Sequence, residues 1–314
     1  MIKKVLVGVV TTALFSTFAV VPAEARPKNQ ARAVAQPDWL EKNIDNPNVR
    51  IIEVSTEPGV YERGHIKNAV KFVWHTDLVD TVNRDIISQS NFTALAQKAG
   101  INDDTTVVLY GDKNNWFAAW GAWIFNVYGQ KDVRILDGGR VKWEKDGRAL
   151  TTAVPTFKPG NFNANAADKN LRANLIKDVL PVAKKAKIAS LIDIRSADEY
   201  NGKIFAPSGF QELAVRAGHI PGAVNIPWGL NVNADGTFKT VAELKKLYAD
   251  KGITGENQII TYCRIGERSS LTWFVLSEIL GFQKVKNYDG SWTEYGNTVG
   301  APINNPAGTI WGAA

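Results

Sequence analysis

The sequence predicts an α/β protein of two similar domains, each a mainly parallel sheet flanked by helices on both faces. Three observations support this fold class. The chain has 314 residues, which suits two domains of roughly 150 residues each. It contains an internal repeat. Within each copy of the repeat, short apolar segments rich in β-branched residues alternate with segments whose apolar residues recur at helical spacing.

The repeat consists of matching motifs at a nearly constant spacing of about 152 residues. The matching runs are Gly-His-Ile at 64–66 and 218–220, a strand-like run at 107–110 and 259–262, and Asp-Gly at 137–138 and 289–290. An earlier apolar pair, 51–54 and 191–194, has a shorter spacing, so the second copy carries an insertion at 201–214. We therefore expect the two copies to fold alike.

The elements can be placed in chain order. The first copy has expected strands at 51–54 and 106–110 and an expected helix at 116–128. A stretch with Pro155, Pro159 and no periodicity, residues 151–170, reads as the linker between domains. The second copy has expected strands at 189–194, 223–226, 258–262 and 285–288, and expected helices at 241–251 and 269–280, each followed by glycine.

The N-terminus has the pattern of a secretory signal peptide over residues 1–25. Lys3 and Lys4 precede an uncharged run at 5–22, and Ala-Glu-Ala at 23–25 fits a cleavage site. A transmembrane anchor is the alternative, and the proline and small residues at the end of the run argue against it. We expect an exported protein, periplasmic or extracellular, that has no stable membrane association after cleavage and begins with a loose arm at 26–36.

Composition excludes several kinds of site. A single cysteine rules out an intramolecular disulfide and zinc sites built from several thiolates, and His75 has no partner at metal-ligand spacing, so no metal site is predicted. The formal net charge is +6, but no dense Lys/Arg run or nucleic-acid-binding motif accompanies it. We expect no nucleic-acid partner.

The segment at 262–270 carries the chemistry. A predicted strand ends at Tyr262 and a helix begins near Ser269, which places Cys263 at the carboxyl edge of a parallel sheet, where such folds bind ligands. Loop N–H groups, the helix start and the guanidinium groups of Arg264 and Arg268 all favour a thiolate. The sequence thus predicts a lowered pKa for Cys263, with Ser269 or Ser270 capping the helix.

These residues resemble the tandem-domain rhodaneses, the thiosulfate sulfurtransferases. The resemblance spans nearly all of the chain after residue 25 and includes Gly-His-Ile-Pro-Gly-Ala at 218–223, the loop at 263–268 and Asp-Gly-Ser-Trp at 289–292. It implies a catalytic domain at 171–314 and a silent domain at 36–150, because Gly111 and Asp112 stand where the second copy has Cys263 and Arg264.

The resemblance implies a role for each candidate residue. Cys263 is the nucleophile. The loop residues expected to bind substrate are Arg264, Ile265, Gly266, Glu267 and Arg268. The residues expected to support the site are Ser269, Asp193, Arg195, His219 and Trp228. Trp228 lines the cleft or fills the core, and Asn114 or Trp116 of the silent domain should approach the cleft. Arg264 and Arg268 could instead form surface ion pairs with Glu267.

The implied reaction moves the outer sulfur of thiosulfate to cyanide or a thiol through a Cys263 persulfide, by a monomer that needs no cofactor. Three alternatives stand beside it: 3-mercaptopyruvate as the donor, a non-enzymatic persulfide carrier or sensor, and a cysteine phosphatase. The four residues between Cys263 and Arg268 are one too few for the phosphatase loop. Animal rhodaneses tend to place an arginine near position 199, where this chain has Glu199, so the loop itself should hold thiosulfate.

Overall fold

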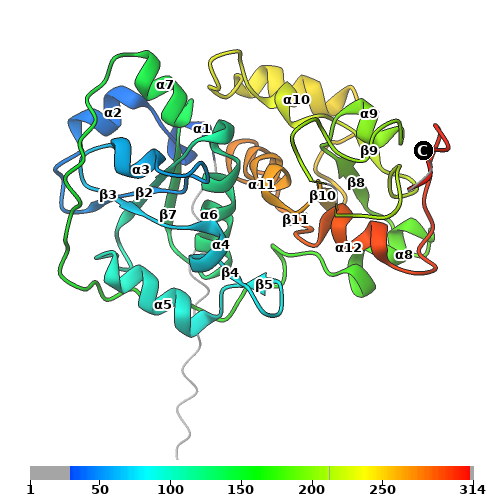
Figure 1. Cartoon of the computed structure of the whole chain (residues 1–314), viewed down its shortest axis with the longest axis horizontal. Coiled ribbons are helices and arrows are strands. Elements are labelled where there is room, and N and C mark those ends of the chain that lie inside the picture. Colours follow the sequence, from blue (N-terminus) through cyan, green and yellow to red (C-terminus); the bar gives the residue numbers. More distant parts are fainter. Residues whose placement is uncertain (1–28, 212, 312–314) are drawn as a thin grey trace, which may run out of the picture.

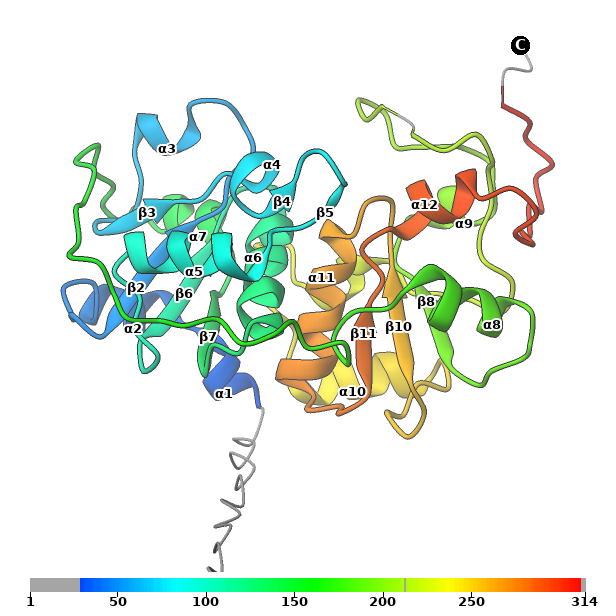
Figure 2. The same cartoon turned by 90° about the horizontal axis from the view of Figure 1, so that it is seen from below.

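The computed structural model describes residues 29–211 and 213–311, which form two α/β domains side by side (Figures 1 and 2). The predicted signal peptide lies outside these residues. Among the described residues, no helix has the length and apolar character needed to cross a bilayer.

Each domain is built on a parallel sheet. In the first, the strand order is β1-β7-β6-β2-β3. These strands are β1 (Val34–Ala35), β7 (Asp132–Leu136), β6 (Thr106–Tyr110), β2 (Val49–Glu53) and β3 (Ala69–Lys71). In the second, the order is β11-β10-β8-β9. These strands are β11 (Val285–Asn287), β10 (Ile259–Tyr262), β8 (Ser190–Asp193) and β9 (Val224–Asn225). The four strands of the second sheet repeat the order of β7-β6-β2-β3, so the sequence repeat is a structural repeat.

Helices cover both faces of the sheets, as predicted. In the first domain the helices are α1 (Gln30–Ala33), α2 (Pro37–Lys42), α3 (Val60–Arg63), α4 (Trp74–Asp77), α5 (Gln89–Lys98), α6 (Trp116–Val127) and α7 (Gly139–Lys145). The second domain has α8 (Leu180–Ala183), α9 (Ala197–Tyr200), α10 (Val241–Ala249), α11 (Glu267–Phe274) and α12 (Ser291–Asn297). The short 3₁₀ or π turns are η1 (Lys113–Asn115), η2 (Leu175–Val179), η3 (Trp228–Asn231) and η4 (Val275–Ile279). A separate antiparallel pair is formed by β4 (Val79–Asp80) and β5 (Asp85–Ile86).

The alternation of side chains along the strands explains why both faces are covered. On β2, Ile51 packs into one hydrophobic cluster and Ile52 into another. On β8, Leu191 and Ile192 divide in the same way between two clusters. Successive residues of a strand point to opposite faces, and both faces of these sheets are apolar. Each sheet therefore needs helices on both sides.

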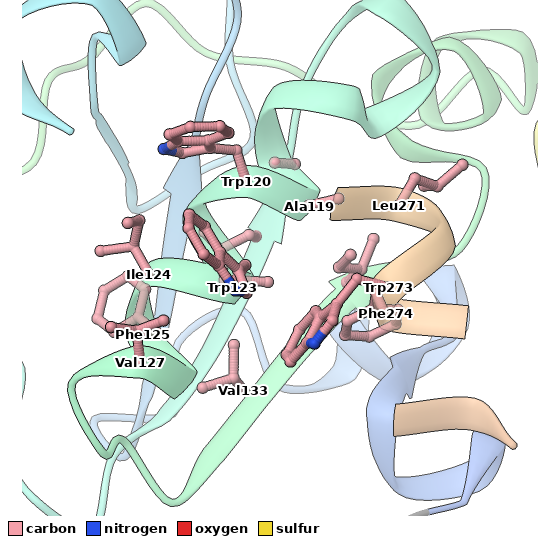
Figure 3. Packing of buried hydrophobic residues seen from close by; sticks show 14 of the residues in the cluster. Ala119, Trp120, Trp123, Ile124, Phe125, Val127, Val133, Leu271, Trp273 and Phe274 are labelled. Atoms are coloured by element: carbon pink, nitrogen blue, oxygen red, sulfur yellow. The ribbon is translucent and has the colours of Figure 1, made fainter. Parts of the chain in front are cut away.

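One hydrophobic cluster runs through both domains. It contains the inner faces of the two sheets together with α6 and α11, which pack against each other at the seam (Figure 3). Trp120 and Trp123 of α6 and Trp273 and Phe274 of α11 are fully buried in it. Because this cluster is continuous, the hydrophobic effect that stabilises each domain also holds the two domains together.

Two details differ from the sequence-based expectations. The arm at 26–36 is not loose over its described part, because residues 30–35 form α1 and β1, and β1 pairs in parallel with β7. The helix expected at 269–280 begins earlier, at Glu267, and after Phe274 it continues as the π turn η4. Most other predicted strands and helices lie within one or two residues of their expected ends.

Candidate active site

The loop that carries Cys263 joins β10 to α11 at the carboxyl edge of the second sheet. Gly266 is the N-cap of α11 and has a φ of 101°, a conformation that favours glycine. A Cβ at Gly266 would lie 2.5 Å from Trp120 and 2.8 Å from the Asp289 Cα. The sharp turn and the lack of a side chain at Gly266 let the loop close around the sulfur.

The predicted cap on Ser269 or Ser270 is wrong. Both hydroxyl groups donate to the Gly266 carbonyl oxygen, at 3.0 and 2.8 Å, so they bind back to the turn and accept no N–H at the helix start. The Ser269 hydroxyl also lies 2.6 Å from Asn287 Oδ1, so the two oxygens share its single hydrogen. Ser269 thus supports the loop by tying it to β11.

The sulfur of Cys263 is enclosed on several sides. The Gly266 N–H donates to Sγ at 3.0 Å, and the thiol donates to Glu267 Oε2 at 3.3 Å. The Ser291 hydroxyl lies 4.0 Å from Sγ and accepts the Cys263 N–H at 3.1 Å. The Cys263 side chain is fully buried. Sequence reasoning did not single out Ser291, although it belongs to the Asp-Gly-Ser-Trp motif.

The predicted lowering of the Cys263 pKa is wrong. Burial and the Glu267 carboxylate raise the pKa of the thiol, although Arg268 and the N–H groups of Ser269 and Gly266 act in the opposite direction. The prediction considered the favourable charges of the loop. It could not include the complete burial of the sulfur or the carboxylate that points at it.

Arg268 is held by a carboxylate from a distant part of the chain. Its two terminal nitrogens donate to the Glu199 carboxylate at 3.1 and 3.2 Å, and both side chains are buried. Although burial alone would raise the pKa of Glu199, Arg268 and further bonds hold it below its ordinary value. Arg268 therefore forms a buried ion pair with Glu199, and its charge near the sulfur is largely compensated.

Arg264 has a different environment. Its Nη1 donates to the Gln211 carbonyl oxygen at 2.5 Å, and its guanidinium stacks on Phe210, 5.4 Å from the ring centre. Both partners lie in the insertion at 201–214. Among the residues that the structure describes, Arg264 contacts no carboxylate within ion-pair distance. Its charge is thus available at the edge of the site.

The remaining support residues brace the loops around the site. The buried pair of Asp193 and Arg195 has an N–O distance of 2.6 Å, and Arg195 also donates to the Gly218 carbonyl oxygen at 2.6 Å. His219 stacks on Tyr200, with ring centres 3.6 Å apart, and its Nδ1 lies 2.7 Å from the Tyr200 carbonyl oxygen. Neither arrangement touches the sulfur.

The first domain contains the same braces without a nucleophile. His65 stacks on Tyr61 and bonds its carbonyl oxygen, and Arg140 joins Glu53 to the Gly64 carbonyl. This agreement supports a structural role for the histidine in both copies.

At Gly111, which matches Cys263 in the repeat, a Cβ would lie 2.3 Å from the Val54 carbonyl oxygen. The backbone at this position leaves no room for a cysteine. The neighbouring Asp112 instead accepts the backbone N–H groups of Thr56 and Glu57.

A cavity of about 340 Å³ opens beside the loop. Its lining residues are Trp116, Ser196, Glu199, Pro207, Phe210, Pro227, Trp228, Gly229, Arg264, Glu267 and Arg268. Trp116 comes from the first domain, as anticipated, and meets Trp228 edge to face at 4.9 Å. Asn114 is not among the lining residues. The cavity therefore has aromatic walls and a charged floor.

A larger cavity, of about 780 Å³, lies behind the loop around Arg172 and Asp289, and none of residues 263–268 lines it. We therefore assign the site to the smaller cavity. Among the described residues, no three His, Cys, Asp or Glu side chains gather as a metal site requires.

Comparisons with known proteins agree with this geometry. The family model for the rhodanese-like domain matches residues 36–146 and 177–298, so the chain belongs to the rhodanese-like family. It is 51% identical to a putative thiosulfate sulfurtransferase of Mycobacterium tuberculosis, over 85% of this chain and 95% of that one. It is 50% identical to the sulfur carrier protein TtuD of Thermus thermophilus, over 85% and 94%.

Solved structures agree as well. The 3-mercaptopyruvate sulfurtransferase SseA of Escherichia coli matches with a TM-score of 0.70 and 30% identity, over 82% of this chain and 98% of that one. With the family and the fold shown, the chain is a tandem-domain sulfurtransferase of the rhodanese type.

Proposed function

We propose that this protein is an exported thiosulfate sulfurtransferase that passes sulfur to a small thiophilic acceptor, cyanide or a thiol, through a persulfide on Cys263. The observation that carries the proposal is the position of the sulfur. Sγ accepts the Gly266 N–H at the start of α11 and lies beside Arg268. A loop N–H and a helix N-terminus stabilise the negative charge that a persulfide sulfur bears.

In the proposed cycle, Sγ attacks the outer sulfur of thiosulfate and sulfite leaves. The acceptor then removes the outer sulfur from the persulfide, and the Cys263 thiol returns. Arg264, at the cavity edge, attracts the anionic donor, and the other loop residues shape the turn around the sulfur. Trp116 and Trp228 form an apolar wall that limits the water near the reacting atoms.

Thiosulfate is the proposed donor for two reasons. The positive charge of Arg264 suits an anionic donor, and relatives that share about half of the sequence are named putative thiosulfate sulfurtransferases. Glu199 and Glu267 offset part of the positive charge in the site. The solved 3-mercaptopyruvate enzyme with 30% identity makes that compound the second candidate donor.

The test is the rate of thiocyanate formation from thiosulfate and cyanide, with 3-mercaptopyruvate assayed in parallel. We expect turnover by the wild type and none by Cys263→Ser. A higher kcat/KM for 3-mercaptopyruvate would contradict the donor assignment. Turnover by Cys263→Ser would contradict the persulfide mechanism.

A non-enzymatic sulfur carrier is the second candidate function, because a relative with 50% identity is named as a sulfur carrier protein. Intact mass after thiosulfate treatment shows one added sulfur in either case. Repeated turnover with small acceptors supports the enzyme, whereas a single loading that only a protein partner can discharge supports the carrier.

Export and a monomeric state are also proposed. The signal-like pattern at 1–25 supports export. Fractionation of cells that express the full chain tests it, because we expect a mature form that begins at Arg26 outside the cytoplasm. The monomer is proposed because one molecule carries a complete Cys263 loop. Size-exclusion chromatography with light scattering tests the monomeric state.

A further inference from the structure

We propose that Glu267 is the base that takes the proton from Cys263 when the sulfur attacks the donor. The inference rests on the proposed function and adds a residue to its chemistry. Glu267 stands on the first turn of α11, and its Oε2 lies 3.3 Å from Sγ as the acceptor of the thiol proton. It is buried and lines the cavity from which the donor arrives. It therefore touches both the nucleophile and the space for the substrate.

The environment of Cys263 calls for a base. The sulfur is fully buried and donates its proton to Glu267 Oε2, and burial together with the Glu267 carboxylate raises the pKa of the thiol, which favours the thiol over the thiolate. A thiol is a weak nucleophile, and the attack needs its proton removed.

The other charged groups that surround the loop have partners of their own. Arg268 is paired with Glu199, and its Nε also lies 3.7 Å from Glu267 Oε1, the carboxylate oxygen that does not face the sulfur. Arg264 bonds the Gln211 carbonyl, and Asp289 forms two bonds with Arg172. Arg84, from the first domain, donates to the Ile265 carbonyl.

The neutral groups that could accept a proton, one beside the sulfur and one farther from it, are also engaged. The Ser291 hydroxyl accepts the Cys263 N–H and donates to the Tyr288 carbonyl. His219 is occupied by Tyr200 and Asn304. Among the described residues, Glu267 thus provides the carboxylate that lies within hydrogen-bond distance of Sγ and can accept its proton.

The proposed step balances without a further reagent. Glu267 Oε2 takes the proton from Sγ while Sγ forms a bond to the outer sulfur of thiosulfate. The bond between the two sulfurs of thiosulfate breaks, and sulfite leaves with that electron pair. Glu267 then gives its proton to sulfite, so the thiol and thiosulfate become a persulfide anion and bisulfite. While Glu267 holds the proton it is neutral, which lowers its repulsion of the anionic donor.

The internal repeat offers an independent comparison. Position 115 in the first domain matches 267 in the second, as Gly111 matches Cys263. Asn115 places its Oδ1 on the Gly111 N–H at 3.1 Å, so a side chain from the same helix start again reaches the loop. An amide cannot serve as a proton acceptor of this kind. The silent domain therefore lacks both the thiol and the carboxylate, and the active domain has both.

The test compares Glu267→Gln with the wild type and with Glu267→Asp, which keeps a carboxylate. We expect kcat/KM for thiosulfate to fall by at least about 100-fold in Glu267→Gln at neutral pH. We expect Glu267→Asp to recover part of that loss. The deficit of Glu267→Gln should shrink as pH rises, since hydroxide then forms the thiolate without Glu267.

A second measurement separates proton transfer from simple electrostatics. The difference in ultraviolet absorbance between each protein and its Cys263→Ser counterpart cancels the tyrosine signal and reports the pKa of Cys263, because the chain has one cysteine. Loss of the Glu267 charge should lower that pKa, so Glu267→Gln should hold more thiolate and still turn over more slowly. Activity equal to or above the wild type would overturn the inference, as would a deficit that stays constant with pH. If the wild type fails to turn over thiosulfate, the proposed function is the one that fails.

Discussion

The buried ion pair between Glu199 and Arg268 makes a prediction that joins stability to substrate binding. We consider Glu199→Gln, which keeps the size of the side chain and its bond to the Ser196 N–H but removes the charge. The carboxylate is fully buried, and the guanidinium is nearly so. Removal of one partner from such a pair leaves an uncompensated buried charge and typically costs about 3–5 kcal/mol. For a domain of this size, Tm should fall by roughly 2–4 °C per kcal/mol.

The same variant should bind thiosulfate more tightly. Without the Glu199 charge, Arg268 keeps only the more distant Glu267 carboxylate, 3.7 Å away, so more of its charge faces the cavity and an anionic donor can take the place of the lost carboxylate. We expect KM for thiosulfate to fall several-fold and thiosulfate to restore part of the lost Tm, because a ligand that binds only the folded state stabilises it. The assays are thermal unfolding with and without thiosulfate, and initial rates.

The effect on stability should also depend on pH. The pKa of Glu199 is lowered in the folded state, so the folded protein releases its proton more readily than the unfolded chain. The stabilisation is therefore complete above the ordinary carboxyl pKa and is lost as pH falls through the folded value. The difference in stability between wild type and Glu199→Gln should disappear in acid.

A matched control is Glu53→Gln in the first domain. Glu53 is a fully buried carboxylate in the first domain, paired with Arg140 at 2.9 Å, and it does not line the cavity beside the loop. The Glu53→Gln variant should lower Tm as well but leave KM for thiosulfate unchanged. A Glu199→Gln protein with wild-type Tm would refute the argument from the buried pair, and an unchanged KM would refute the idea that Glu199 masks Arg268.

Three further predictions concern the loop. The rate of Cys263 alkylation should keep rising with pH after that of an ordinary thiol has levelled off, because burial and a nearby carboxylate raise the pKa of Cys263. The stability that the thiol contributes should be lost as pH rises through the folded-state pKa of Cys263. Cys263→Ser should abolish this loss of stability at alkaline pH. Gly266→Ala should cost at least about 2 kcal/mol in thermal unfolding and most of the activity, because its Cβ would meet Trp120, whereas Gly300→Ala, also at positive φ but in open space, should keep its activity. Arg84→Ala removes a 2.9 Å bond to a loop carbonyl and should lower turnover a few-fold with a stability loss of about 1 kcal/mol. Unchanged kinetics would show that the bond has no role in turnover.

The sequence could predict the features that depend on neighbours along the chain. The strand that ends at Tyr262, the turn at Gly266 and the position of Cys263 at the sheet edge follow from periodicity and turn chemistry. The repeat then predicted two domains of one architecture, and the structure and the family match confirm it.

The features that sequence reasoning missed depend on residues far apart in the chain. Glu199 lies 69 residues before Arg268, so their pairing appears only once α9 and α11 are placed together. The burial of Cys263 depends on the packing of the whole loop, including Ser291 from 28 residues further along the chain, which no local pattern reports. The direction of its pKa shift was wrong for this reason.

The seam between the domains brings equivalent parts of the two repeats together. The helices α6 and α11 occupy matching positions of the repeat, and they pack against each other (Figure 1). Asp137 and Asp289 also match, and each accepts a bond from the opposite domain, from the Phe238 N–H and from Arg84. Contact between equivalent surfaces is the arrangement of a two-fold symmetric dimer. The chain thus has the form of a two-fold dimer whose two halves are covalently joined, so each molecule holds one thiol site and one matched position without a thiol in a fixed 1:1 ratio.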